Sequence, residues 1–240
     1  TYKKGYVTLI KGTIVQILDY AVKMEIIPTN YMKLARIPKQ TVTKEKKFYT
    51  REELLQFLKI VKENYSSDIY IIFHLLAYTG MRVGELRALT WKDIDLKNKT
   101  LTINKNMMNV GSKSTVSNTK TKTSERIIFL DDTTIKELKE FRKNSDSFNI
   151  AGRLVNHPKR HYIGSTLKSI LASFPELGKI TPHGFRHTHA TLLFEGGSTP
   201  KDVQNRLGHK DITTTLNTYT HITEEKNKET TVIFEKIMSL

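Results

Sequence analysis

Three short segments of the sequence are rich in arginine, histidine and tyrosine. They contain Arg82, then His183 and Arg186, then His209 and Tyr219. A planar guanidinium group matches the equatorial oxygens of a phosphoryl-transfer transition state with two parallel hydrogen bonds. Histidine donates hydrogen bonds and transfers protons near neutral pH, and a tyrosine hydroxyl becomes a usable nucleophile where nearby cations lower the cost of the phenolate. Together these side chains could break a phosphodiester bond without a metal ion.

Each of these side chains also has a simpler interpretation. Arg82 lies in the first turn of a predicted helix, where a cation is disfavoured by about 0.3–1 kcal/mol, and Glu85 could balance it as an ordinary Arg–Glu pair. His183 and His187 are four residues apart, as in a zinc site, but Gly184 stands where the HExxH motif has its glutamate. We therefore predict no metal ion. A tyrosine ten residues after a histidine carries no information on its own.

The charge of the chain indicates a polyanionic partner. The 39 lysines and arginines against 24 acidic residues give a net charge of +15, which is typical of proteins that bind nucleic acid, although a lysine-rich surface can also serve solubility alone. The excess is uneven, since residues 97–126 hold seven basic residues and one acid. The residues expected to contact DNA are Lys113, Lys122, Arg153, Lys159 and Arg160.

The composition is that of a globular protein, with 38% hydrophobic and 26% charged residues. Cysteine is absent, which excludes disulfides and Cys-ligated zinc and fits a reducing compartment. No apolar run reaches the roughly 18–20 residues of a membrane span, and no secretion signal opens the chain. We therefore expect a soluble, cytoplasmic protein without contact to a membrane. Because the chain starts at Thr1 and not at Met, we expect that residues precede it.

The elements that must position these side chains are mostly helices. Apolar periodicity and capping residues predict helices at 12–24, 51–64, 68–78, 82–89, 133–144, 162–173, 183–194, 199–206, 211–218 and 226–238. Strands are predicted at 99–105 and 125–130, with the Ser/Thr/Lys-rich segment 111–123 between them as an exposed basic turn. The predicted fold class is mainly α with a small antiparallel β-sheet (α+β).

A domain boundary is predicted near residue 47. Residues 39–47 are polar, charged and without periodicity, as in a linker. Thr50 followed by Glu53 then forms a capping box before an apolar run, which marks the start of a new unit. The predicted domains are therefore 1–47 and 48–240.

The order and spacing of the motifs resemble the tyrosine recombinases of the phage-integrase family. The matching motifs are Thr-Gly-Met-Arg-x-x-Glu-Leu at 79–86, Thr-Lys-Thr before a short strand, His-Gly-Phe-Arg-His-Thr at 183–188, Leu-Gly-His at 207–209, and Tyr219. The resemblance extends from about residue 12 to the end of the chain. It implies that 12–47 are the last helices of a DNA-binding core-binding domain and that 48–240 are the catalytic domain.

The resemblance also implies a role for each residue. Arg82 and Arg186 would bind the scissile phosphate, His183 would transfer a proton or donate a hydrogen bond, His209 would hold a phosphate oxygen, and Tyr219 would be the nucleophile.

A lysine in the turn between the two predicted strands would protonate the departing 5′ oxygen. Two candidates stand there, and we prefer Lys120 over the alternative Lys122 because of its offset from Arg126.

The implied activity is site-specific recombination of double-stranded DNA through a 3′-phosphotyrosyl intermediate, without ATP, metal or cofactor. It points to the integrase of a mobile element or prophage, acting at the nucleoid of a bacterium. In the family, the C-terminal helix packs on an adjacent protomer, so a tetramer on DNA joined through residues 231–240 is expected. The alternatives are a DNA-binding regulator without chemistry, a type IB topoisomerase-like enzyme that relaxes supercoils, and a metal-dependent nuclease.

Overall fold

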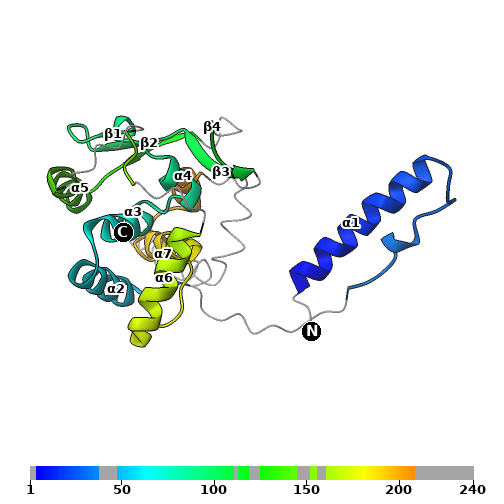
Figure 1. Cartoon of the computed structure of the whole chain (residues 1–240), viewed down its shortest axis with the longest axis horizontal. Helices are drawn as coiled ribbons and strands as arrows, with labels where there is room; N and C mark the ends of the chain where they lie inside the picture. The colour runs from blue at the N-terminus through cyan, green and yellow to red at the C-terminus, as the bar shows by residue number, and fades with distance from the viewer. Residues whose placement is uncertain are drawn as a thin grey trace, which may run out of the picture. The chain divides into compact units, whose positions relative to one another are not determined.

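The computed structural model describes residues 4–37, 48–110, 113–118, 125–144, 152–155 and 161–208 (Figure 1). The chain forms two compact units, Thr1–Glu45 and Lys46–Leu240, which are described separately. Within the described residues, no helix is both long enough and apolar enough to cross a bilayer.

The first unit contains the helix α1 (Lys4–Lys23) and the 3-10 turn η1 (Tyr31–Lys33). Asn30 caps this turn by accepting a hydrogen bond from the Met32 amide at 3.1 Å. Its side-chain amide donates to the Val15 carbonyl and to Asp19, at 3.0 and 2.9 Å, and so holds the turn against α1. The helix begins eight residues before the predicted start at 12, because the apolar pattern continues toward the N-terminus and the helix runs through its glycines despite their low helix propensity.

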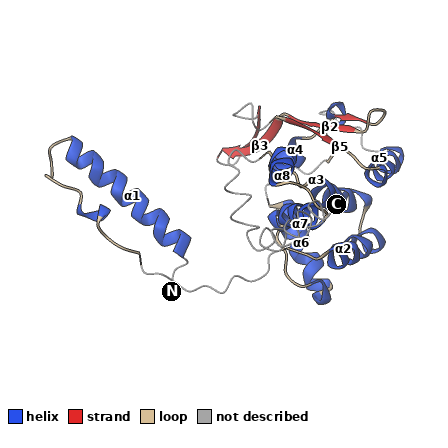
Figure 2. Cartoon of the chain, turned by 180° about the vertical axis from the view of Figure 1, so that it is seen from behind, coloured by secondary structure: helices blue, strands red, loops and turns tan. Residues whose placement is uncertain are grey.

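One part of the core of the second unit lies between α2 (Arg51–Asn64), α3 (Ser67–Thr79) and α7 (Pro182–Glu195), which lie side by side in both views (Figures 1 and 2). Phe57, Phe73 and Phe185, one from each helix, are fully buried. Their ring centroids are 5.0–5.6 Å apart, which is within the range of favourable aromatic pairs. The three rings therefore fix α7, which carries His183 and Arg186, against α3.

The other helices among the described residues of this unit are α4 (Val83–Ala88), α5 (Asp132–Asn144), α6 (Tyr162–Ser173) and α8 (Pro200–Leu207), with short 3-10 turns η2 (Trp91–Asp93) and η4 (Pro175–Leu177). The predicted capping box of Thr50 and Glu53 opens α2. Gly80 and Gly208 end α3 and α8 in the left-handed conformation, with φ of 62° and 68°. The mainly helical fold class is confirmed. The helices predicted at 211–218 and 226–238 lie outside the described residues.

The strands form two small antiparallel sheets (Figure 2). One has the order β1-β2-β5 and is built from β1 (Ile94–Asp95), β2 (Thr100–Ile103) and β5 (Arg126–Phe129). The other is a hairpin of β3 (Lys105–Val110) and β4 (Lys113–Asn118). The prediction of an exposed turn over 111–123 is thus wrong for 113–118. This segment is rich in Ser, Thr and Asn, which are typical of turns, and its apolar and polar residues alternate too weakly to predict the strand.

The hairpin packs on α4 at Gly84. A Cβ atom at this position would overlap the side-chain oxygen of Asn106 in β3 and lie 3.1 Å from the Met107 carbonyl oxygen, so the glycine favours the close approach. This contact brings the β3–β4 hairpin next to the helix that begins after Arg82.

Candidate active site

The centre of the site is the C-terminal end of α8. Arg126 from β5, Arg186 from α7 and Arg82 at the start of α4 donate hydrogen bonds to the carbonyl oxygens of residues 206, 207 and 208, in that order, at 2.8, 2.9 and 3.0 Å. The last carbonyls of a helix have no partner within the helix and carry its partial negative charge. Three cations from three elements therefore converge on one helix end.

Arg186 links this helix end to the turn after α3. Its side chain is almost fully buried, with 3% of the residue exposed, and its Nη1 donates to the carbonyl of Gly80 at 2.8 Å. The left-handed conformation of Gly80 turns the chain sharply there, and a Cβ at that position would lie 2.6 Å from the Leu207 side chain. Arg186 therefore joins α3, α7 and α8 at one point.

Arg82 is paired with Glu85, as the sequence suggested. It stands one residue before α4 as its N-cap, and not within the first turn as predicted. Its Nη1 donates to Glu85 Oε1 at 2.8 Å, while its backbone N–H donates to Oε2 at 2.8 Å. The Arg82 side chain remains 40% exposed, so it is the accessible cation of the site.

Glu85 forms ion pairs with two arginines, Arg82 and Arg126. Arg126 donates to both of its carboxylate oxygens, at 2.7 and 3.1 Å, in addition to the contacts from Arg82. Burial of Glu85 would raise the pKa of its carboxyl group, but the hydrogen bonds and charges of Arg126 and Arg82 outweigh burial and lower the pKa below its ordinary value. Glu85 is therefore ionised at neutral pH and holds the two guanidinium groups close together.

His183 lies at the exposed start of α7, beside the two predicted arginines. Desolvation of the ring lowers its pKa to about 4, and electrostatic repulsion from the neighbouring His187, Arg186 and Arg82 acts in the same direction. The ring is neutral at pH 7 and can accept a proton. Its ring meets that of His187 edge-on, with centroids 4.8 Å apart. Across the described ranges, no group of three or more potential metal ligands forms around this pair.

A pair formed by the buried His189 and the partly buried Arg206, which the sequence did not predict, also holds α8. His189 Nδ1 lies 2.9 Å from the Ala77 carbonyl, which can only accept, so this nitrogen carries the proton and Nε2 accepts from Arg206 Nε at 2.9 Å. Burial lowers the pKa of His189 to about 3. Arg206 also donates to the carbonyls of Tyr78 and Phe129, at 3.2 and 3.3 Å. The histidine-rich segment thus contains one histidine whose contacts are structural.

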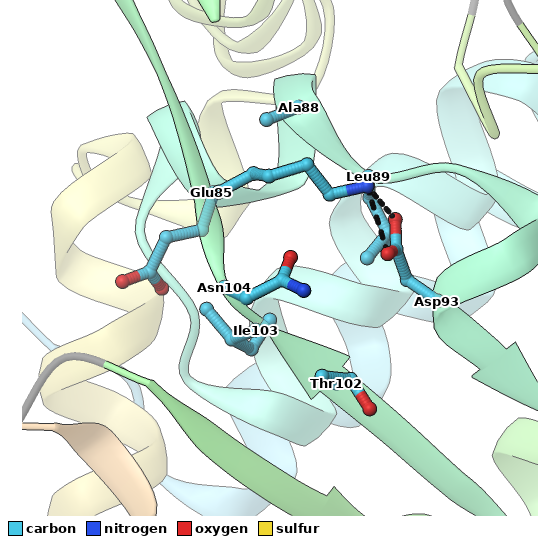
Figure 3. Close-up of a pocket in the computed structure, with 8 residues that line it drawn as sticks. Glu85, Ala88, Leu89, Asp93, Thr102, Ile103 and Asn104 are labelled. Atoms are coloured by element: carbon cyan, nitrogen blue, oxygen red, sulfur yellow. Dashed lines mark hydrogen bonds and ion pairs between the residues drawn. The ribbon is translucent and has the colours of Figure 1, made fainter. Parts of the chain in front are cut away.

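A small pocket lies on the β3 side of Glu85, lined by residues of α4, β2 and β3 (Figure 3). Glu85 and Asp93 lie at its opposite ends, and the Glu85 carboxylate points away from Asp93 (Figure 3). Asp93 forms its own ion pair with Lys105 at 2.8 Å and accepts from the Thr90 amide at 2.8 Å. The two acids therefore hold different cations, and the pair of Asp93 and Lys105 fixes the start of the β3–β4 hairpin.

The structure brings Arg82, His183 and Arg186 together. In the sequence, His209 directly follows Gly208, whose carbonyl accepts a hydrogen bond from Arg82. Arg153 forms an isolated β-bridge with Thr90, and Lys113 opens β4. The other predicted site residues lie outside the described residues: Lys120, Lys122, Lys159, Arg160, His209 and Tyr219.

Comparison with known proteins gives matches over most of the chain. Residues 47–226 match the model of the phage integrase family. The integrase of Staphylococcus phage L54a is 31% identical over 261 residues, covering 95% of this chain and 73% of that protein. The ICEBs1 integrase of Bacillus subtilis is 30% identical and covers 89% of this chain, but the match spans only 61% of the relative. A Tn1549 transposon integrase bound to transposon right end DNA has the same fold, with a TM-score of 0.79, 22% identity, and 95% and 80% of the two chains covered.

Proposed function

The chain belongs to the phage integrase family of tyrosine recombinases, and we propose that it cuts and rejoins double-stranded DNA at specific sites for a mobile element or prophage. Tyr219 is the proposed nucleophile, and the product of cleavage is a 3′-phosphotyrosyl link. The first unit, by the same family relationship, is the end of a core-binding domain that holds DNA.

The convergence of Arg82 and Arg186 on the end of α8 supports this proposal most directly. Their hydrogen bonds to the carbonyls of residues 207 and 208 hold the chain where it continues to His209. A phosphate bound by the exposed Arg82 would therefore lie near the positive charge of the buried Arg186 and near the next residue of the chain. Tyr219 follows Gly208 by eleven residues, which span at most about 40 Å when extended, so the proposed nucleophile is within reach of these cations.

The proposed reaction needs one proton acceptor and one proton donor. The Tyr219 oxygen forms a bond to phosphorus, the bond from phosphorus to the 5′ oxygen breaks, and the phenol proton passes to neutral His183 or to water. Lys120, or alternatively Lys122, gives a proton to the departing 5′ oxygen. The 5′ hydroxyl of a partner strand then attacks the phosphotyrosyl ester and restores a phosphodiester. The energy of the bond is kept in the ester throughout, so the exchange requires no ATP.

The test is incubation with a nicked duplex carrying the end sequence of the element. Cleavage near the nick releases a short oligonucleotide and traps the covalent complex, which migrates as a shifted band on a denaturing gel. Tyr219→Phe should abolish this band, while Tyr65→Phe, the same change at a tyrosine that packs on Phe174, should leave it intact.

Other outcomes would support the alternatives. Specific binding without a covalent band would indicate a regulator. Relaxation of supercoiled DNA of any sequence would indicate topoisomerase activity, and strand cleavage that EDTA abolishes would indicate a nuclease.

We also propose that the C-terminal segment 231–240 packs on a neighbouring protomer and joins a tetramer on DNA. An apolar groove of about 520 Å³ between α2, α3 and α7 is a suitable receptor, since its lining includes Leu54, Leu55 and Leu192. Leu55 is 43% exposed there. Deletion of 231–240, or Leu55→Glu in the groove, should reduce higher-order complexes on DNA in gel-shift assays. Unchanged assembly of both variants would refute this contact.

A further inference from the structure

Arg206 connects the end of α8 to three other elements of the second unit. Its Nη2 donates to the Tyr78 carbonyl in the last turn of α3 at 3.2 Å, and its Nη1 donates to the carbonyl of Phe129, the last residue of β5, at 3.3 Å. Its Nε donates to Nε2 of the buried His189 in α7 at 2.9 Å. One guanidinium group thus binds three elements, each through a different nitrogen.

The same end of α8 holds the two arginines that are proposed to bind the scissile phosphate. The carbonyl of Leu207 accepts a hydrogen bond from Arg186 at 2.9 Å, and the carbonyl of Gly208 accepts one from Arg82 at 3.0 Å. These carbonyls belong to the two residues that directly follow Arg206. Their positions therefore depend on how firmly the Arg206 side chain holds the end of the helix.

Two guanidinium groups join α3 and α8 in parallel. Arg186 bridges the carbonyl of Gly80, directly after α3, and the carbonyl of Leu207. Arg206 forms the second link, from α8 to the Tyr78 carbonyl. Loss of Arg206 would remove this second link and the contact with β5, so the end of α8 could shift relative to α3.

His189 orients the Arg206 guanidinium. Its Nδ1 donates to the Ala77 carbonyl at 2.9 Å, which leaves Nε2 as the acceptor for Arg206 Nε. Because the guanidinium is planar, an acceptor that fixes the direction of Nε also fixes the directions of both Nη groups. His189 therefore acts on the end of α8 through Arg206.

We propose that Arg206 is a positioning residue, which fixes the end of α8 so that Arg186 and Arg82 are held in the geometry that the cleavage step requires. This inference rests on the proposed function. A misplacement of catalytic groups by about 1 Å can lower a rate about 100-fold, whereas DNA affinity is shared among many phosphate contacts. Loss of Arg206 should therefore lower the cleavage rate much more than the affinity for DNA.

The experiment uses the full chain and the nicked duplex, at a temperature well below the Tm of every variant. It measures the single-turnover rate of covalent-complex formation at saturating DNA, and the Kd for the same duplex. For Arg206→Gln we expect a loss of about 100-fold in the rate and a rise of no more than about threefold in Kd. Arg206→Lys keeps the charge but cannot bind three acceptors in one plane, so its rate should fall at least about tenfold. The lysine variant is the milder change if the glutamine variant folds poorly.

Two substitutions of His189 separate positioning from a purely structural role. In His189→Gln the amide oxygen can accept from Arg206, near the place of Nε2. In His189→Asn the amide nitrogen can donate to the Ala77 carbonyl, near the place of Nδ1, but no acceptor reaches Arg206. Each variant loses one buried hydrogen bond, so the two should lose similar amounts of Tm, while the rate for His189→Asn should be at least about tenfold lower than the rate for His189→Gln.

Phe141→Leu controls for lost stability. The Phe141 ring is buried in α5 and stacks on Trp91, so its replacement should lower Tm and leave the cleavage rate of the folded protein unchanged. A loss of rate in this control as large as that of Arg206→Gln would overturn the inference. Parent-like rates for the Arg206 variants, equal losses in rate and in DNA affinity, or equal rates for the two His189 variants would overturn it too. If the unaltered chain forms no covalent complex, the proposed function fails and the inference falls with it.

Discussion

Replacement of Arg186 by lysine tests the convergence of three helices on one guanidinium group. In the native structure this group donates to the carbonyls of Gly80 and Leu207 at 2.8 and 2.9 Å, and the residue is 3% exposed. An ammonium group is a single donor nitrogen on a flexible stem, so it cannot reproduce two hydrogen bonds with the same geometry. At least one buried carbonyl should lose its charged partner.

The loss of one such hydrogen bond corresponds to about 1.5–3 kcal/mol of unfolding free energy. For a unit of about 200 residues this lowers Tm by about 3–12 °C. The proposed contact with the scissile phosphate is lost as well, and removal of one donor to a transition-state oxygen reduces the cleavage rate by about 100–1000-fold. DNA affinity should fall by no more than about threefold, because many phosphates contribute to binding.

Calorimetry, single-turnover cleavage of the nicked duplex and equilibrium gel shifts measure these three quantities on the same protein. Arg142→Lys is the matched control, since it makes the same change at an arginine outside the site. An unchanged Tm would contradict the two carbonyl contacts. Equal losses in cleavage and in DNA binding would contradict the role assigned to Arg186.

Three further predictions concern the packing, the pH dependence and the DNA-binding surface. Gly80→Ala should destabilise the protein by about 1–3 kcal/mol in urea unfolding, because φ is +62° and the added Cβ would lie 2.8 Å from the His189 ring; full stability would show that the turn can relax. His74 and His189 have pKa values lowered by burial to about 4 and about 3, so both are neutral when folded but become protonated in the unfolded chain below pH 6.5. Stability should therefore fall as the pH drops from 7 to 5, by about 2 kcal/mol for each histidine, and a His74→Gln variant whose pH dependence equals that of the parent would refute the contribution of His74. Neutralising Lys159 and Arg160 together should reduce the slope of log affinity against log salt by about 2, and an unchanged slope would place the DNA-binding surface elsewhere.

Local signals in the sequence were sufficient to predict the positions of most of the described helices. The predicted helices 51–64 and 162–173 have the observed bounds, and 68–78 differs by one residue at each end. Capping residues define these ends: Thr50 begins α2 and Gly80 ends α3, and each acts within a few residues of its own position. Such signals can be read along the chain without knowledge of the fold.

The contacts between distant segments could not be predicted in this way. Glu85 was expected to pair with Arg82, three residues before it, but not with Arg126, which is 41 residues away. His189 and Arg206 were likewise present in the sequence without any pattern that pairs them. These pairs exist because α7, α8 and β5 pack together, so they follow from the tertiary structure and not from local spacing.

The three guanidinium contacts at the end of α8 also have a mechanical consequence. The carbonyls they hold belong to the last residues before the chain continues toward Tyr219. A force that reaches Gly208 from the downstream chain therefore acts on these hydrogen bonds and through them on all three cations. A displacement of the end of α8 would therefore also change the arrangement of the three guanidinium groups.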